Sequence, residues 1–254
     1  MTKVELVGIL NVTPDSFSDG GLYTETDKAL DHAVQLQRDG ATYIDVGAES
    51  TRPNATPLTA QQEWQRLQTL WPSLTTRFGD KLSLDTYHPQ TVRRAARFGK
   101  FIVNDVTSFH DKKMIDVVVE CGLSCIVSHL PAVAAGDIQS AHTGILIDTV
   151  EQVRDELLQR RELLLARGIA SQNIILDPGI GFGKTPETNW ELLRFAEMVP
   201  EIDVMIGYSR KRFLGDDRME LEPNLKAGRI AIAAGARYLR VHDVAGHRQL
   251  LEES

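Results

Sequence analysis

The chain has 254 residues, of which 42% are hydrophobic and 25% charged, and its formal net charge at pH 7 is −7. This composition is typical of a globular protein and argues against disorder, while the acidic charge gives no sign of the basic face of a nucleic-acid-binding protein. No apolar run approaches the roughly 20 residues of a transmembrane helix and no signal-peptide pattern is visible, so we expect a cytoplasmic protein without a membrane partner.

Apolar, β-branched runs alternate with helical patterns along the whole chain. The runs predict strands at 4–10, 43–48, 81–86, 101–106, 124–130, 173–179, 203–209 and 238–244. The clearest helices are expected at 26–38, 59–78, 149–167 and 222–234, with a short last helix at 246–253. Such alternation indicates parallel βα units. Eight units in a chain of this length predict an α/β fold, a (β/α)8 TIM barrel, as one domain over residues 1–254. An open doubly wound sheet is the alternative.

Polar side chains follow nearly every predicted strand. Among them are Asp85, Asn104 and Asp177. In barrels the active site lies at the C-terminal ends of the strands, so we expect these groups to meet at one mouth. Two carboxylates and a carboxamide there would suit a ligand edge rich in N–H donors. Each aspartate taken alone could instead cap a helix or pair with a lysine, because burying an unpaired carboxylate is costly.

An acidic protein that binds an anionic substrate needs a local cluster of cations. Arg52, Lys211, Arg240 and His242 are the candidates. Alternation along a strand places Arg240 and His242 on the same side, here the barrel interior. Structural ion pairs with Asp243 or with glutamates are the other interpretation of these two residues.

The segment Asp177-Pro-Gly-Ile-Gly-Phe-Gly-Lys-Thr resembles the tail of a phosphate-binding loop. That motif requires glycine where Pro178 stands, so we set a nucleotide site aside. The glycines instead allow the backbone to pass close beneath a flat ligand, with Phe182 as an apolar wall.

The remaining cysteines and histidines give no catalytic pattern. Cys121 and Cys125 are expected to be two buried thiols, and His110, His142 and His247 to be surface residues. No zinc-site spacing and no serine nucleophile elbow is present in the sequence, which argues against a hydrolase.

Several segments together resemble the dihydropteroate synthase family. They are GILNVTPDSFSDGG, IDVGAESTRP, LSLDT, IVNDV, ILDPGIGFGK, IGYSRK and RVHDV, in the order of the family and over nearly the whole chain. The resemblance implies a (β/α)8 barrel that joins a pterin diphosphate to 4-aminobenzoate and releases diphosphate, with Mg²⁺ as cofactor. It also implies a target of sulfonamides and a homodimer formed through the last helices.

The resemblance assigns roles to residues at matching positions. It implies a pterin pocket, a diphosphate site and a 4-aminobenzoate site, with Asp85, Asp177, Lys211 and Arg240 as the catalytic group. The pterin pocket comprises Asp85, Asn104, Asp177, Phe182, Gly207 and Lys211. The diphosphate site comprises Asn11, Arg52, Arg240 and His242, with Asn11 as the Mg²⁺ ligand, and Thr51, Pro53 and Ser209 shape the 4-aminobenzoate site.

Some positions depart from the family pattern. Ala48 and Asn54 stand where glycines are usual, Ser128-His-Leu-Pro-Ala replaces a methionine-histidine motif, and Arg212 stands where serine is common. The pterin residues are intact and the 4-aminobenzoate side has drifted, so we predict altered recognition of 4-aminobenzoate or sulfonamides. A pterin-binding paralogue without condensation activity is the first alternative function. A methyltetrahydrofolate-dependent corrinoid methyltransferase is the second.

Overall fold

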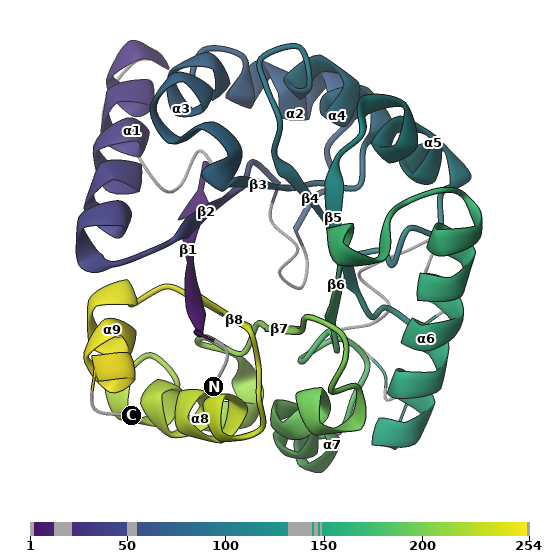
Figure 1. The fold of residues 1–254 in the computed structure, drawn as a ribbon. Coiled ribbons are helices and arrows are strands. Elements are labelled where there is room, and N and C mark those ends of the chain that lie inside the picture. The colour runs from purple at the N-terminus through teal and green to yellow at the C-terminus, as the bar shows by residue number, and fades with distance from the viewer. Residues whose placement is uncertain are drawn as a thin grey trace.

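Parallel strands form a ring with helices packed around it (Figure 1). The computed structural model describes residues 3–12, 22–49, 55–131, 144, 147 and 149–252, without the side chains of 22–25. The eight strands form one sheet in the order β6-β5-β4-β3-β2-β1-β8-β7. A parallel bridge between Leu176 and Val204 joins the two ends of that order and closes the barrel. The predicted (β/α)8 fold is therefore confirmed, and the open doubly wound sheet is wrong.

The elements follow one another in strand–helix alternation. The strands are β1 (Glu5–Asn11), β2 (Tyr43–Gly47), β3 (Leu82–Asp85), β4 (Ile102–Asp105), β5 (Ser124–Ser128), β6 (Ile174–Asp177), β7 (Met205–Ile206) and β8 (Tyr238–Val241). The helices are α1 (Leu22–Asp39), α2 (Ala60–Leu67), α3 (Trp71–Phe78), α4 (Pro89–Ala95), α5 (Lys112–Cys121), α6 (Val150–Ala166), α7 (Pro186–Glu191), α8 (Leu221–Ala233) and α9 (Val244–Glu252).

The helix predicted over 59–78 is two helices, α2 and α3. Thr59 caps α2 through a capping box with Gln62, in which the side chain of each residue accepts from a backbone N–H of the other. Pro72 then lies in the first turn of α3. Proline has no N–H to continue a helix, and its ring clashes with the carbonyl four residues earlier. The leucine periodicity that runs through both helices hides this break.

The barrel interior has an apolar floor. Along each strand the side chains alternate between the interior and the surrounding helices. A small cluster of inward residues, distinct from the large core between strands and helices, lies inside the barrel. It comprises Val7, Ile126, Ile175, Met205 and Tyr238, with Tyr43 and Ile102 packed against it. The rings of Tyr43 and Tyr238 meet edge-on at 5.9 Å. The floor fills the N-terminal half of the interior and leaves the other half for polar groups.

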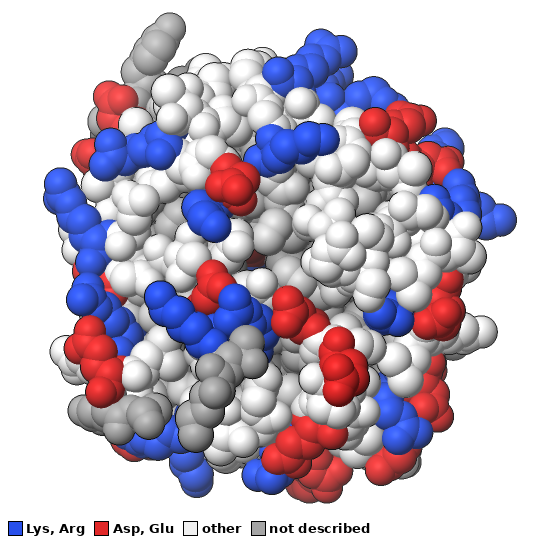
Figure 2. Space-filling view, viewed as in Figure 1, with Lys and Arg blue, Asp and Glu red and all other residues white. Residues whose placement is uncertain are grey.

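Charge is mixed over the surface. On the face drawn in Figure 2, Lys and Arg side chains lie among Asp and Glu side chains and form no broad field of one sign. Within the described ranges, none of the helices combines the length and apolar composition needed to cross a bilayer.

Two expectations about single residues change. Cys125 is buried as predicted, whereas Cys121 is only half-buried, and both are free thiols. His247 is fully buried, not a surface residue. Its Nδ1 lies 2.6 Å from the carbonyl oxygen of Asp243 and its ring contacts Tyr208 at 5.9 Å. His247 lies on the inward face of α9. That helix is too short for the periodicity of the sequence to show which face is buried.

The other two histidines expected at the surface differ in outcome. His110 is half-buried, and its Nδ1 accepts a hydrogen bond from Arg160 Nη2 at 2.7 Å. It therefore lies at the edge of the barrel wall against α6 and is not freely solvated. His142 lies outside the described residues.

Candidate functional site

Directly above the floor, Arg240 joins two aspartates from neighbouring strands. Its Nε donates to Asp45 Oδ2 at 2.6 Å and its Nη2 donates to Asp85 Oδ2 at 2.8 Å. Asn104 Nδ2 donates to the same Asp45 oxygen at 3.2 Å. Arg240 therefore does form structural ion pairs, the alternative interpretation, but with Asp45 and Asp85 and not with Asp243 or a glutamate. The predicted inward direction of Arg240 is confirmed.

Two acceptor atoms in this group remain unpaired. Among the described residues, Asp45 Oδ1 and Asn104 Oδ1 are buried without a hydrogen-bond partner. A buried polar atom left unpaired costs roughly 1–3 kcal/mol. Native proteins leave few such atoms without a reason. Unpaired acceptors in a group on the inward side of the strands suit a ligand that brings N–H donors.

Burial shapes the charges of the site. Desolvation raises the pKa of Asp85 to about 7, against the attraction of Arg240, and the nearby carboxylates of Asp45, Glu63 and Asp105 add to the rise. Burial likewise lowers the pKa of Lys211 to about 8, opposed mainly by Asp177. Both groups therefore titrate close to neutral pH, where small changes in their surroundings alter their charge.

Asp177 ends β6 and organises the turn that follows it. Its Oδ2 accepts a hydrogen bond from Ser128 Oγ at 2.9 Å, and its Oδ1 accepts from Gly179 N at 2.8 Å. Gly179 has φ 63, and a Cβ there would lie 2.0 Å from the carbonyl oxygen of His129. Ser128, which departs from the family pattern, is therefore a direct partner of Asp177.

Lys184 shows why the glycine segment is not a nucleotide loop. Its side chain is buried, and Nζ donates to the carbonyl oxygens of Gly179 and Phe182 at 2.9 Å each. A phosphate-binding lysine must present its charge to the ligand. Here the lysine holds the turn together from beneath, and burial lowers its pKa to about 7.

Lys211 reaches the same side of the mouth from the segment after β7. Its Nζ donates to the carbonyl oxygen of Ile180 at 2.5 Å and lies 5.3 Å from the centre of the Phe182 ring. Gly207 leaves space beside it, since a Cβ at Gly207 would lie 3.6 Å from Asp177 Oδ2. The predicted pterin residues thus come together at one mouth.

Ser209 and His242 pair at the rim. Ser209 Oγ accepts from the backbone N of His242 at 3.2 Å and lies 3.0 Å from its Nδ1. Asn11 ends β1 beside Gly47 of β2 and is half-buried. Thr51, Arg52 and Pro53 lie outside the described residues, so their predicted roles stay predictions.

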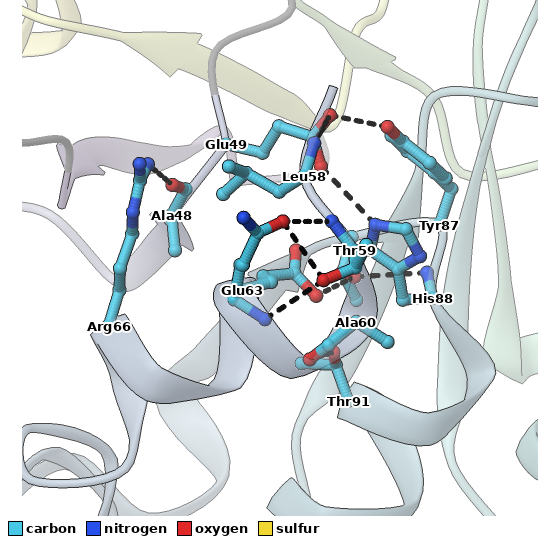
Figure 3. A network of polar contacts seen from close by, with 12 residues as sticks. Ala48, Glu49, Leu58, Thr59, Ala60, Glu63, Arg66, Tyr87, His88 and Thr91 are labelled. Atoms are coloured by element: carbon cyan, nitrogen blue, oxygen red, sulfur yellow. Dashed lines mark hydrogen bonds and ion pairs between the residues drawn. The ribbon is translucent and has the colours of Figure 1, made fainter. Parts of the chain in front are cut away.

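A second polar network adjoins the mouth and is not predicted by the sequence (Figure 3). The carboxylate of Glu49 accepts hydrogen bonds from Tyr87 Oη and, at 3.2 Å, from Leu58 N, and it lies 3.3 Å from His88 Nε2. Behind it, buried Glu63 accepts from Thr86 Oγ1 at 2.8 Å.

Three ligand atoms of this network could in principle surround a cation. Those of Glu49, Glu63 and His88 lie within 4.8 Å of one another. Glu63 is already paired with Thr86, and Glu49 with Tyr87 and His88, so we interpret the network as a structural clamp between the loops after β2 and β3.

Sequence reasoning misses Asp45 and the Glu49 network for different reasons. Asp45 interrupts an apolar run whose pattern indicates only a buried strand. The available signal is the charge itself: an aspartate inside an apolar run, on the same side of the strand as Tyr43, indicates a buried carboxylate with a partner. Tyr87 and His88 follow Asp85-Thr86 directly, but nothing in the sequence indicates that they meet Glu49.

Comparisons with known proteins agree with this geometry. Residues 7–242 match the family described as pterin binding enzyme. The chain is 35% identical to dihydropteroate synthase of Escherichia coli (strain K12), over 96% of this chain and 88% of that protein. It is similar to Xanthomonas albilineans dihydropteroate synthase with 4-aminobenzoic acid (33% identity, TM-score 0.88, 99% and 92% of the two chains). It is also similar to the Yersinia pestis enzyme in complex with a sulfonamide drug (31% identity, TM-score 0.87, 99% and 93%).

Proposed function

This chain belongs to the dihydropteroate synthase family of pterin-binding enzymes, and from that premise we propose that it condenses 6-hydroxymethyl-7,8-dihydropterin diphosphate with 4-aminobenzoate. The products are 7,8-dihydropteroate and diphosphate. The observation that carries the proposal is the group of Asp45, Asp85, Asn104 and Arg240 at the barrel mouth, in which two buried acceptor atoms have no partner among the described residues.

The pterin is proposed to lie above the floor with its ring amide and amine toward Asp85, Asn104 and Asp177. A flat ring there would pass beside Gly207, where no side chain intervenes, and near Phe182 and Lys211. Buried acceptors discriminate strongly for a ligand that supplies the matching donors. These contacts orient the CH2 carbon of the ligand toward the open side of the mouth.

The reaction breaks the bond between the CH2 carbon and the diphosphate oxygen, and the electron pair leaves with diphosphate. The carbon becomes cationic and its charge spreads over the pterin ring. The carboxylates of Asp85 and Asp177 stabilise that charge electrostatically. The neutral amine of 4-aminobenzoate then forms the new C–N bond, and the proton that it loses passes to the released diphosphate or to water. Asp85, Asp177, Lys211 and Arg240 are the catalytic group, and the mechanism needs no protein nucleophile.

Arg52, Arg240 and His242 are proposed to receive the diphosphate, and Asn11 to hold Mg²⁺. The amide oxygen of Asn11 is a hard ligand on the rim of the mouth, and Mg²⁺ commonly takes one or two protein oxygens together with phosphate oxygens and water. The ion would neutralise charge that develops on the leaving diphosphate. If so, Asn11→Ala should raise the Mg²⁺ concentration needed for half-maximal activity, and Asn11→Asp, which keeps an oxygen ligand, should raise it less.

Thr51, Pro53 and Ser209 are proposed to shape the 4-aminobenzoate site, which sulfonamides would also occupy. Inhibition by a sulfonamide that competes with 4-aminobenzoate tests this assignment. We further propose that the protein acts in the cytoplasm as a homodimer. Two large apolar side chains, Met219 just before α8 and Leu221 at its first residue, are exposed and support that assembly. Sedimentation of the purified protein tests it.

The decisive experiment is diphosphate release from the pterin diphosphate with Mg²⁺, with and without 4-aminobenzoate. We expect release that depends on the amine, and loss of it in Asp177→Asn, whose carboxamide keeps the size of the side chain but not its charge. Tight pterin binding without turnover would contradict the synthase and support the non-condensing paralogue. Failure to bind the pterin diphosphate would favour the corrinoid methyltransferase.

A further inference from the structure

The backbone between β7 and α8 contains a residue in an unfavourable conformation. Arg210 has φ 61, in the left-handed region. This region suits glycine and is uncommon for a residue with a long side chain. Such conformations persist where the surrounding structure holds them, and they are concentrated at functional sites. Arg210 lies between Ser209 and Lys211, two of the proposed site residues.

Asn224 in the first turns of α8 holds this segment. Its side chain is only 4% exposed. Its Oδ1 accepts from Arg210 N at 2.9 Å, and its Nδ2 donates to the carbonyl oxygens of Arg218 at 2.9 Å and Glu220 at 2.6 Å. The carboxamide therefore uses its oxygen and both of its N–H donors, and it ties the beginning of the segment to its end.

The helix that carries Asn224 lies very close to the end of β7. A Cβ at Gly228, one turn further along α8, would lie 2.7 Å from the hydroxyl of buried Tyr208. Tyr208 directly precedes Ser209. Close packing of α8 against the end of β7 therefore places Asn224 beside the segment that contains Arg210.

We propose that Asn224 is a positioning residue, which holds Arg210 in the left-handed conformation and so directs Ser209 and Lys211 into the site. Ser209 meets His242 on one side of Arg210. Lys211 on the other side reaches Ile180 and Phe182. A change of φ at the residue between them would turn the two side chains apart. The inference rests on the proposed function, because it gives these two residues contact with substrate.

The test measures the cost of Asn224→Ala in two backgrounds, the parent chain and Arg210→Gly. Glycine adopts the left-handed conformation without a Cβ clash, so a backbone with glycine at this position needs no such support. We expect Asn224→Ala to lower kcat/KM and to raise Kd for the pterin diphosphate about tenfold in the parent, and less than about threefold in the Arg210→Gly background. Equal costs in both backgrounds would overturn the proposal.

Thermal unfolding of the parent chain, the two single variants and the double variant distinguishes positioning of Ser209 and Lys211 from simple anchoring of α8. A role confined to anchoring α8 would lower the Tm equally in both backgrounds and leave kcat/KM of the folded protein unchanged. If Asn224→Ala does not fold, Asn224→Asp replaces it. That variant loses both donors and turns a carboxylate oxygen toward the carbonyl oxygens of Arg218 and Glu220, so it also weakens the hold of Asn224 on the segment. We expect it to lower kcat/KM in the parent and to cost less in the Arg210→Gly background, and equal costs in both backgrounds would contradict the proposal.

The Kd for pterin diphosphate distinguishes failure of the proposed synthase activity from failure of the proposed role of Asn224. A parent chain that binds pterin diphosphate without amine-dependent release disproves the synthase, while the Kd values still decide the role of Asn224. A parent that is active, with costs of Asn224→Ala that do not depend on residue 210, disproves the role of Asn224 alone.

Discussion

At the scale of single residues, Asp85 combines partial burial, with its side chain 16% exposed, with an ion pair to Arg240. Its pKa is raised to about 7 by burial, against the pull of Arg240. An ionised carboxylate accepts hydrogen bonds from N–H donors more strongly than a protonated one. The bound pterin should therefore favour the ionised form.

We accordingly predict that pterin binding below pH 7 releases a proton from Asp85. The affinity should fall as the pH is lowered from about 7, by up to about tenfold per pH unit. Calorimetry in two buffers with different ionisation enthalpies measures the released proton directly. Asp85→Asn is the control and should show no proton release of this kind. A binding heat that does not depend on the buffer would contradict the prediction.

His88 gives a second prediction for single residues. Burial opposes its charged form, but the hydrogen bond to Glu49 and the charges of Glu63 and Glu49 outweigh it and raise the pKa of His88. In Glu49→Gln the effect of burial remains and the partner charge is lost, so the pKa of His88 should fall. An NMR titration of the ring tests this, with His32 on α1 as the reference.

The same variant has a consequence for stability. A raised histidine pKa stabilises the folded state below the unfolded value of about 6.5, and the contribution is lost as the pH rises through the folded pKa. Glu49→Gln should therefore lower the free energy of unfolding chiefly below a pH of about 6.5, where His88 is protonated in the folded parent chain. An unchanged His88 titration in the variant would show that Glu49 is not its main partner.

The sequence predicts the place of a site residue when that residue lies at the C-terminal end of a strand. Asp85 and Asp177 end their strands and Asn104 is the last residue but one of β4, so their place at the mouth follows from the fold alone. Asp45 of β2 and Arg240 of β8 meet over the intervening strand β1, although they are 195 positions apart. Such a pair depends on the register of strands that are distant in sequence, which a local pattern does not contain.

At the scale of elements, the turn after β6 is held by contacts that leave no room for a side chain. Gly179→Ala would place a Cβ 2.0 Å from the carbonyl oxygen of His129, at φ 63. Gly168 has φ 92, but a Cβ there meets nothing within 4 Å. Comparison of the two alanine variants separates the clash from the cost of the left-handed backbone.

We predict that Gly168→Ala lowers the free energy of unfolding by about 1–2 kcal/mol, the cost of backbone strain alone. Gly179→Ala should cost at least about 2 kcal/mol more, because the backbone of β5 or β6 has to move. Urea unfolding measures both. Equal losses would mean that the turn yields without disturbing the strands.

Helix boundaries show where element prediction fails. The strands follow from runs of β-branched residues, and all eight are present near their expected positions. The leucine spacing continues across the break between α2 and α3 and conceals it, although Pro72 is visible in the sequence. The role of Asn224 is invisible for another reason: its partners belong to a segment with little regular structure, and only their three-dimensional path brings them to α8.

At the scale of the whole molecule, buried Asp105 makes stability depend on pH. Burial raises its pKa to about 6, against the hydrogen bonds that it accepts from Thr107. A raised carboxyl pKa means that the folded state binds more protons than the unfolded state between pH of about 4 and 6. Its contribution to stability therefore falls as the pH rises through that window.

Asp105→Asn should remove this dependence while keeping an oxygen for Thr107. Relative to the parent chain, the variant should gain stability between pH of about 4 and 6, by no more than about 3 kcal/mol, and the difference should be level above that range. Denaturant unfolding at a series of pH values measures it. A difference that does not vary with pH would show that Asp105 is ionised throughout.

The apolar floor closes the N-terminal end of the barrel interior, so substrates and products share the opening at the other end. If the pterin binds at the depth of Asp45 and Arg240, as proposed, it has to enter before the amine that reacts with it, and a molecule of 4-aminobenzoate that binds first would block its path. We therefore expect ordered binding of the two substrates. That order would be imposed by the seven side chains of the floor, which lie at the opposite end of the interior from the proposed site.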